Sequence, residues 1–309
     1  MSVRVGVVWN PAKGEKEEIE RALRGVDAAE VSWFETTEED PGGGATRQAL
    51  SSGAEVVIAA GGDGTVRAVA EQLAESGADV VLGIVPRGTG NLLARNLGVP
   101  LDDIPAAIAR ALEGETQRID VGWAEAVIDG ERVRRAFLVM AGFGIDAHMI
   151  TETDAELKDK AGWLAYVESL GRAVSASELI DIRAAFDHGD AEEEKVHTLI
   201  VGNCGTIQGG ITVLPDAVPD DGELDVLLLR ADGIAGWLDT MRNVLWDNGV
   251  KRLLGGSSQA ESSDTASHRR AKELVIDLSA PRVFEVDGDD LGEATRIAIS
   301  VQPGAILVR

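Results

Sequence analysis

The chain has 309 residues, of which 44% are hydrophobic, and its formal net charge is −24. The length is enough for two packed domains. The excess of acidic residues argues against non-specific binding to nucleic acid and against broad electrostatic binding to an anionic membrane. The single cysteine, Cys204, excludes an internal disulfide and a cysteine metal cluster, and four scattered histidines argue against a histidine metal site. No apolar run reaches the ~18 residues of a membrane span. The chain enters a strand pattern without a signal-peptide layout, so we expect a cytoplasmic protein.

Acids crowd two segments that read as loops, residues 38–40 and 192–194. They predict a solvated surface, with adaptation to high salt as the alternative.

The first 115 residues alternate apolar runs with amphipathic stretches. Strands are expected at residues 3–9, 31–34, 55–59 and 80–85, and helices at 15–23, 45–50, 66–73, 92–97 and 104–112. Strands that alternate with helices predict an α/β domain with a doubly wound parallel sheet.

Three of these strands end in loops that carry glycine or asparagine, at residues 10–14, 61–65 and 88–91. Ligands bind beyond the carboxyl ends of the strands in open α/β sheets. Convergence of the three loops on one edge therefore predicts a nucleotide site.

The segment at residues 61–65 lies where a strand leads into a helix. Its glycines let the backbone approach a ligand, and the helix N-terminus favours phosphate. Asp63 would repel phosphate unless a divalent metal lies between them, which suggests a metal–nucleotide site. The alternative is a tight turn in which Asp63 caps the helix.

The pattern changes near residue 115 to short strands separated by turn residues. An Asp-Gly turn at 129–130 predicts a hairpin of residues 116–128 and 132–143. Further strands are expected at 179–186, 196–203, 223–230, 274–278, 283–286 and 295–301, helices at 146–177 and 234–246, and a mobile loop at 255–267. This pattern predicts a β-sandwich domain with inserted helices.

Two acidic turns in this half could carry chemistry. Residues 215–225 offer Asp221 and nearby carbonyls to a hard divalent cation, although an Asp-Gly turn before a strand explains the same residues. In residues 286–290, a carboxylate could act as general base if the domains face each other; a plain hairpin turn is the alternative. Cys204 is expected to be an inert core residue.

Taken in order, these pieces resemble the diacylglycerol kinase catalytic-domain family, in particular the bacterial lipid kinases related to sphingosine kinases. The stretches that carry the resemblance are Asn10-Pro11-Ala12-Lys13-Gly14, Gly61-Gly62-Asp63-Gly64-Thr65, Pro86-Arg87-Gly88-Thr89-Gly90-Asn91, Asp120-Val121-Gly122, Gly142-Phe143-Gly144, Lys160-Ala161-Gly162 with Tyr166, Asn203 with Gly209-Gly210, Pro215-Asp216-Ala217 with Asp221-Gly222, and Asp287-Gly288.

The resemblance implies an ATP:lipid phosphotransferase that uses Mg²⁺. It implies an NAD-kinase-like nucleotide-binding domain at 1–120 plus about 302–309, and a β-sandwich lipid-substrate domain at 121–301. The residues that it implies for ATP are Asn10, Thr36, Gly61, Gly62, Asp63, Gly64, Thr65, Val66, Arg67, Gly88, Thr89, Gly90 and Asn91. Asp221 would be a metal ligand with the carbonyls of Val218 and Glu223, Asp63 would act with the catalytic magnesium, and Asp289 would be the base.

Two positions depart from the usual pattern of that family. Arg67 and Ala68 follow the glycine-rich motif where Asn-Glu is usual, so Arg67 either contacts phosphate or is a surface helix residue. Asp289 stands where the family places the catalytic Glu, which shortens the reach by about 1.5 Å against a hydrogen-bond window of ~2.6–3.2 Å. Asp290 or a water could compensate.

Two other functions stay open: a soluble-substrate kinase of the NAD-kinase type, and a catalytically weak nucleotide-binding or regulatory protein. The expected partners are ATP and a membrane lipid. The lipid would be reached by transient peripheral contact through Trp163, Leu164 and Tyr166, with core packing as the alternative use of these side chains. A homodimer through sheet-edge pairing of the second domains is also left open. Diacylglycerol, a sphingoid base, phosphatidylglycerol and an isoprenoid alcohol all remain candidate acceptors.

Overall fold

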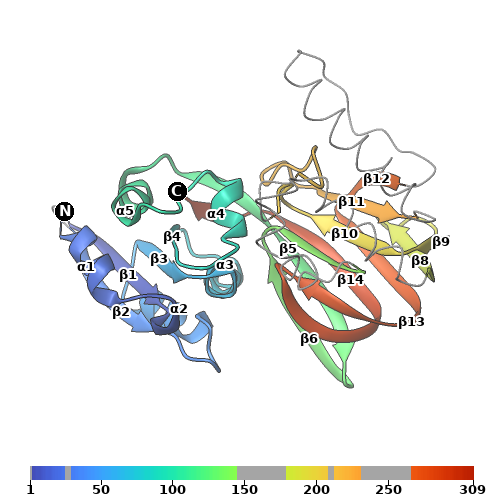
Figure 1. Ribbon diagram of the computed structural model, residues 1–309, viewed down its shortest axis with the longest axis horizontal. Helices are drawn as coiled ribbons and strands as arrows, with labels where there is room; N and C mark the ends of the chain where they lie inside the picture. Colours follow the sequence, from blue (N-terminus) through green and yellow to red (C-terminus); the bar gives the residue numbers. More distant parts are fainter. Residues whose placement is uncertain (1, 25–28, 145–178, 208–211, 231–265) are drawn as a thin grey trace, which may run out of the picture.

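The computed structural model describes residues 2–24, 29–144, 179–207, 212–230 and 266–309 (Figure 1). Its first part is a parallel sheet in the order β4-β3-β1-β2. The strands are β1 (Val3–Trp9), β2 (Ala29–Glu35), β3 (Val56–Gly61) and β4 (Val81–Pro86). The helices are α1 (Lys16–Leu23), α2 (Gly43–Ser51), α3 (Asp63–Ser76), α4 (Leu92–Asn96) and α5 (Ile104–Glu113), with a 3-10 turn η1 (Pro11–Lys13).

The connections put a pair of helices on each face of this sheet. The chain moves from β1 outward to β2, then back across β1 to β3 and on to β4. Because such crossovers are right-handed, α1 lies on one face and α2 and α3 on the other. The α2 helix contacts α3, whereas α1 contacts α5, which packs on β4. The predicted doubly wound domain is therefore confirmed.

Burial on both faces explains why these strands read as continuous apolar runs. Every residue of β3 and β4 is buried, as is usual for parallel strands between helices. A carboxyl-terminal edge that is common to β1, β3 and β4 then carries the loops predicted to bind a ligand.

The second part is antiparallel. Its strands are β5 (Gln117–Ile128), β6 (Glu131–Phe137), β7 (Met140–Phe143), β8 (Ile180–Phe186), β9 (Glu192–Val196), β10 (Thr198–Gly202), β11 (Leu224–Leu229), β12 (Ala266–Ala271), β13 (Glu273–Val286) and β14 (Asp289–Val308). The long β14 pairs with β13 and β5, and its end lies parallel to β4 through Leu307↔Val81 and Val308↔Leu82. Figure 1 shows β14 running from the antiparallel part to the C-terminus beside β4.

Two hydrophobic clusters fill the described residues. One gathers the parallel strands and their helices with Ile306 and Val308, and the other gathers inward side chains of the antiparallel strands. The boundaries 1–120 with about 302–309, and 121–301, stay a prediction. In the described part of the chain, no helix is long and apolar enough to cross a bilayer.

The expected strand at 132–143 is wrong, because the chain breaks between β6 and β7. The Asp287 carboxylate accepts the N–H groups of Leu138, Val139 and Met140 at 2.8, 2.8 and 3.0 Å. The strand before the break, β6, pairs with β5, whereas the strand after it, β7, pairs with β10 and β13. The acceptor lies 147–149 residues away, so no local pattern marks this bend.

The reading of residues 192–194 as a loop is also wrong, since they lie in β9. This strand pairs with β8 alone among the described residues, and charged side chains suit a sheet edge. Arg269 lies 2.5 Å from Glu192, and Arg230 lies 2.7 Å from Glu194.

Two smaller differences concern strand limits. The strands expected at 274–278 and 283–286 form one strand, β13, whose pairing is irregular between Asp277 and Arg282. Residues 266–267, expected in a loop, begin β12. The rest of that loop and the helices expected at 146–177 and 234–246 lie outside the described residues.

Candidate functional site

The three loops meet at the carboxyl ends of β1, β3 and β4. The Asn10 side chain donates from Nδ2 to Thr65 Oγ1 at 3.3 Å, which joins the end of β1 to the start of α3. The loops after β3 and β4 touch through their backbones, because a Cβ added at Gly88 would lie 2.7 Å from Gly62 Cα. The structure thus brings together the segments at 10–14, 61–65 and 88–91.

Glycine and asparagine are needed here for space and for backbone conformation. A Cβ on Gly61 would lie 2.6 Å from the Thr65 side chain. Asn91 has a left-handed φ of 47°, and its amide group bonds both backbone groups of Gly88, at 2.9 and 2.7 Å. Asn91 therefore closes its own loop.

Asp63 ties the two glycine loops together. Its carboxylate accepts the N–H groups of Asn91 at 2.8 Å and Leu92 at 2.5 Å, at the start of α4. The alternative in which Asp63 caps its own helix is wrong, because the N-cap of α3 is Gly62. Burial raises the pKa of Asp63, the N–H groups of Leu92 and Asn91 lower it, and the nearby charge of Asp289 raises it again.

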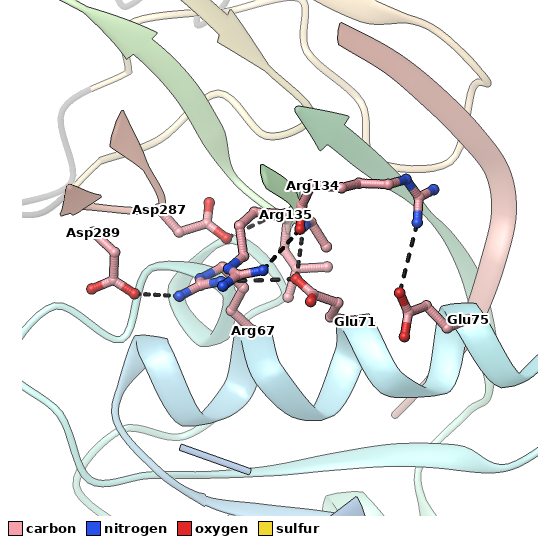
Figure 2. A network of polar contacts seen from close by, with 9 residues as sticks. Arg67, Glu71, Glu75, Arg134, Arg135, Asp287 and Asp289 are labelled. Atoms are coloured by element: carbon pink, nitrogen blue, oxygen red, sulfur yellow. Dashed lines mark hydrogen bonds and ion pairs between the residues drawn. The ribbon is translucent and has the colours of Figure 1, made fainter. Parts of the chain in front are cut away.

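Asp289 reaches this site from the antiparallel part of the chain and pairs with Arg67 on α3. Arg67 Nη2 lies 2.5 Å from Asp289 Oδ2, and Nη1 lies 3.9 Å from Glu71 Oε2 (Figure 2). Arg67 is only 9% exposed, so the alternative of a surface helix residue is wrong. Glu71 also accepts the N–H of Ala136 at 2.8 Å.

Three carboxylates lie near Arg67 in Figure 2, those of Asp289, Glu71 and Asp287, and Asp289 is the most exposed of them. Asp287 is buried and holds the β6–β7 bend; burial raises its pKa to about 6, against the lowering by those N–H groups and by Arg67. The Asp289 side chain is 49% exposed, and its Oδ2 would lie 3.5 Å from a Cβ on Gly64.

Asp290 points away from this site. Successive side chains of a strand lie on opposite faces, and Asp290 accepts the N–H of Gly292 at 2.6 Å. Among the two adjacent aspartates, Asp289 alone lies beside the glycine-rich loop.

The other residues expected to contact ATP lie in different settings. Thr36 is buried, and its N–H donates to the Trp9 carbonyl at 2.9 Å, beside the end of β1. Thr89 and Gly90 complete the loop after β4. The Val66 side chain belongs to the core, and its N–H is taken by the Gly62 carbonyl at 3.0 Å.

Sequence reasoning left out Lys13 as a site residue. Its Cε would lie 3.9 Å from a Cβ on Gly62, and the residue is exposed. Lys13 is therefore a positive charge within reach of an anion on this loop. The sequence feature that could have identified Lys13 is its position in the segment 10–14, one of the three loops predicted to bind a ligand.

The acidic turn expected to hold a metal is paired with an arginine instead. The guanidinium of Arg270 contacts Asp221 through Nη2 and lies 3.2 Å from Glu223 through Nη1. The other Asp221 oxygen accepts the N–H of Glu223 at 3.1 Å, and Val218 is exposed. These residues do not fit a divalent ion, because a positive side chain holds the carboxylate that would bind it. Within the described ranges, no three acidic, histidine or cysteine side chains are arranged to hold a metal.

Two family models match the chain. Residues 4–124 match the diacylglycerol kinase catalytic domain, and residues 139–309 match the YegS C-terminal NAD kinase beta sandwich-like domain. The second match agrees with the β-sandwich predicted for this half.

Curated proteins and solved structures agree with these matches. A Pseudomonas aeruginosa protein (strain UCBPP-PA14) named "probable lipid kinase YegS-like" is 33% identical over 84% of this chain and 78% of its own. A Staphylococcus saprophyticus diacylglycerol kinase is 28% identical over 94% of this chain and 90% of its own. A crystal structure of a diacylglycerol kinase from Bacillus anthracis strain Sterne covers 99% of this chain and 96% of its own, with a TM-score of 0.67 at 22% identity, which shows the shared fold.

The chain therefore belongs to the diacylglycerol kinase catalytic-domain family, with the C-terminal domain of the YegS-like lipid kinases.

Proposed function

We propose that this protein transfers the γ-phosphate of ATP to the hydroxyl group of a lipid, with Asp289 as the base. The observation that carries the proposal is a half-exposed carboxylate beside a glycine-rich loop at a helix N-terminus. Phosphoryl transfer needs mainly positioning and charge neutralisation, which such a site can supply.

The first domain would hold the nucleotide. The loops at 61–65 and 88–91 lie together at the start of α3, whose first N–H groups and dipole favour phosphate. Lys13 would add a positive charge over Gly62. Mg²⁺ bound with ATP would neutralise phosphate charge, and Asp63 could face it because each of its oxygens keeps a second lone pair.

Asp289 would take the proton of the lipid hydroxyl as the hydroxyl oxygen attacks the γ-phosphorus. A new P–O bond forms, the bond to the β-phosphate oxygen breaks in line, and ADP leaves. The Arg67 guanidinium holds the Asp289 carboxylate in one direction. This orientation matters more for aspartate than for glutamate, because the shorter side chain leaves less room to adjust.

The substrate would enter between a nucleotide domain of 1–120 with about 302–309 and a lipid domain of 121–301. Transient contact with the inner face of the membrane, from the cytoplasm, would supply the lipid. The apolar residues proposed for this contact, 163–166, lie outside the described residues. A homodimer through sheet edges stays a proposal.

The test compares Asp289→Asn with Asp290→Asn, its matched neighbour. Transfer of labelled phosphate from ATP is measured on a panel of lipids in mixed micelles and on NAD, and ATP binding is measured separately. We expect one lipid to be labelled by the wild type and by Asp290→Asn. Asp289→Asn should bind ATP and transfer nothing.

Three results would overturn parts of the proposal. Full activity of Asp289→Asn removes Asp289 as the base. Label on NAD alone indicates a soluble-substrate kinase. ATP binding without transfer to any acceptor indicates a nucleotide-binding or regulatory protein.

A further inference from the structure

A positive charge from another strand, the guanidinium of Arg270, lies at the acidic turn of residues 215–225. Arg270 lies on β12 directly across from Asp225 on β11. Arg270 is 49 residues from Asp221 in the chain, so the pairing depends on the β11–β12 register and not on local sequence.

The three nitrogens of the guanidinium face three different carboxylates. Nη2 contacts Asp221, Nη1 lies 3.2 Å from Glu223, and Nε lies 3.7 Å from Asp225. A planar fork with several donors suits such an arrangement, which one ammonium group could not satisfy equally well.

These carboxylates need a counter-charge to lie so close together. The Asp225 side chain is 10% exposed and the Asp221 side chain is 27% exposed, so water screens them only in part. Like charges in a partly buried cluster repel strongly unless a cation lies among them. Arg270 is the cation that the described residues place there.

The acidic turn is also hydrogen-bonded to a buried residue of β5. The buried Asp120 of β5 accepts the N–H of Gly222 at 2.7 Å and that of Gly304 at 2.6 Å. Its own N–H donates to the Pro219 carbonyl at 2.7 Å. The turn is therefore hydrogen-bonded to β5, and Asp120 links it to β14; these two strands run between the parallel and the antiparallel parts.

From this geometry we infer that the Arg270 guanidinium is the built-in cation of the acidic turn and takes the place of a divalent ion there. The turn then holds its shape without metal, and divalent ions are needed only with the nucleotide. The inference concerns stability, so it stands or falls independently of the proposed lipid kinase activity.

The test is the thermal midpoint of the nucleotide-free protein in EDTA and in MgCl₂ or CaCl₂ at matched ionic strength. The wild type should melt at the same temperature in all three. Arg270→Ala should melt several degrees lower in EDTA and regain part of the loss with Mg²⁺ or Ca²⁺, because the vacated carboxylates can then bind the ion.

Arg269→Ala is the matched control. Arg269 is the preceding residue of β12 and pairs with Glu192 and Glu194. Its loss should lower the midpoint without any recovery by divalent ions.

Two results would overturn the inference. The first is a wild-type thermal midpoint that rises with Mg²⁺, with no such rise in Asp221→Asn. The second is a thermal midpoint of Arg270→Ala that does not rise when Mg²⁺ or Ca²⁺ is added. If Arg270→Ala does not fold, Mn²⁺ binding is followed by electron paramagnetic resonance on the nucleotide-free wild type and Asp221→Asn. Equal binding supports the inference, and a site lost in Asp221→Asn overturns it.

Discussion

At the scale of single residues, the two departures from the family pattern are in contact with each other. Arg67 and Asp289 are separated by 222 residues and form a pair at 2.5 Å. Glu71 and Asp287 also lie near this guanidinium, but backbone N–H groups occupy them. The Arg67 guanidinium therefore contacts the Asp289 carboxylate where that carboxylate lies beside the glycine-rich loop.

Arg67→Lys should separate orientation from charge. Lysine keeps the positive charge and loses the planar fork, so Asp289 is held less firmly. We expect kcat for lipid phosphorylation to fall by roughly 10- to 100-fold, the range that small misplacement of a reacting group produces, with little change in the KM for ATP. Steady-state kinetics at varied ATP measures both.

Arg134→Lys is the control for this substitution. Arg134 lies in the same network of polar contacts (Figure 2) but pairs with Glu75 at 3.7 Å and Glu125 at 3.3 Å, and not with Asp289. It should leave kcat unchanged. A rise in the KM for ATP with normal kcat in Arg67→Lys would instead make Arg67 a phosphate contact.

At the scale of elements, the site depends on how closely the β3–α3 and β4–α4 loops approach. The backbones of Gly62 and Gly88 touch, and Asp63 bonds across to the start of α4. The loops thus form one surface, although each belongs to a different βα unit.

Gly88→Ala should push these loops apart. The added Cβ would lie 2.7 Å from Gly62 Cα and 3.0 Å from Asn91 Oδ1, and the nearer atom is backbone. We expect a KM for ATP that rises about tenfold and a loss of about 1–3 kcal/mol in the free energy of unfolding, as for other overpacked sites. Kinetics and urea denaturation measure the two effects.

Gly43→Ala provides the same substitution at the start of α2. Its Cβ would have no neighbour closer than 3.7 Å, so neither quantity should change. A normal KM for ATP in Gly88→Ala would argue that the nucleotide does not use this junction.

At the scale of the whole molecule, acidic residues are numerous, and some of their carboxyl groups are buried in the interior. The net charge is −24, and burial raises the pKa of Asp63, of Asp225 to about 6 and of Asp287 to about 6. The fold therefore keeps carboxylates in places where their ionisation is unfavourable.

This arrangement predicts a fold that is more stable in mild acid than at neutral pH. A carboxyl whose folded pKa lies above its unfolded value stabilises the fold below the unfolded pKa, and that stability is lost as pH rises through the folded pKa. For Asp287, a rise from 3.8 to about 6 corresponds to about 3 kcal/mol. The free energy of unfolding should therefore fall between about pH 4 and pH 7.

Calorimetry across this pH range at low and high salt checks the prediction. Salt should reduce the part that arises from surface repulsion and leave the part from buried groups. A melting temperature that climbs steadily from pH 5 to neutrality would contradict it.

Local pattern was enough for much of the fold. The strand at residues 3–9 and the helix at 104–112 follow from hydrophobic periodicity, because the side chains that decide them are near neighbours. The break at Leu138 and the edge strand at 192–196 were missed, because a distant carboxylate and two distant arginines decide them.

The sequence by itself determined the doubly wound first domain, the three loops at its carboxyl edge and the family, since these rest on short motifs in order. Only the tertiary structure decided which charges meet: Asp289 with Arg67, and Asp221 with Arg270. The physical reason is that strand order and register bring together side chains far apart in the chain. An ion pair forms only when the two charged groups lie close in space, and the residue types alone do not show which charged groups do so.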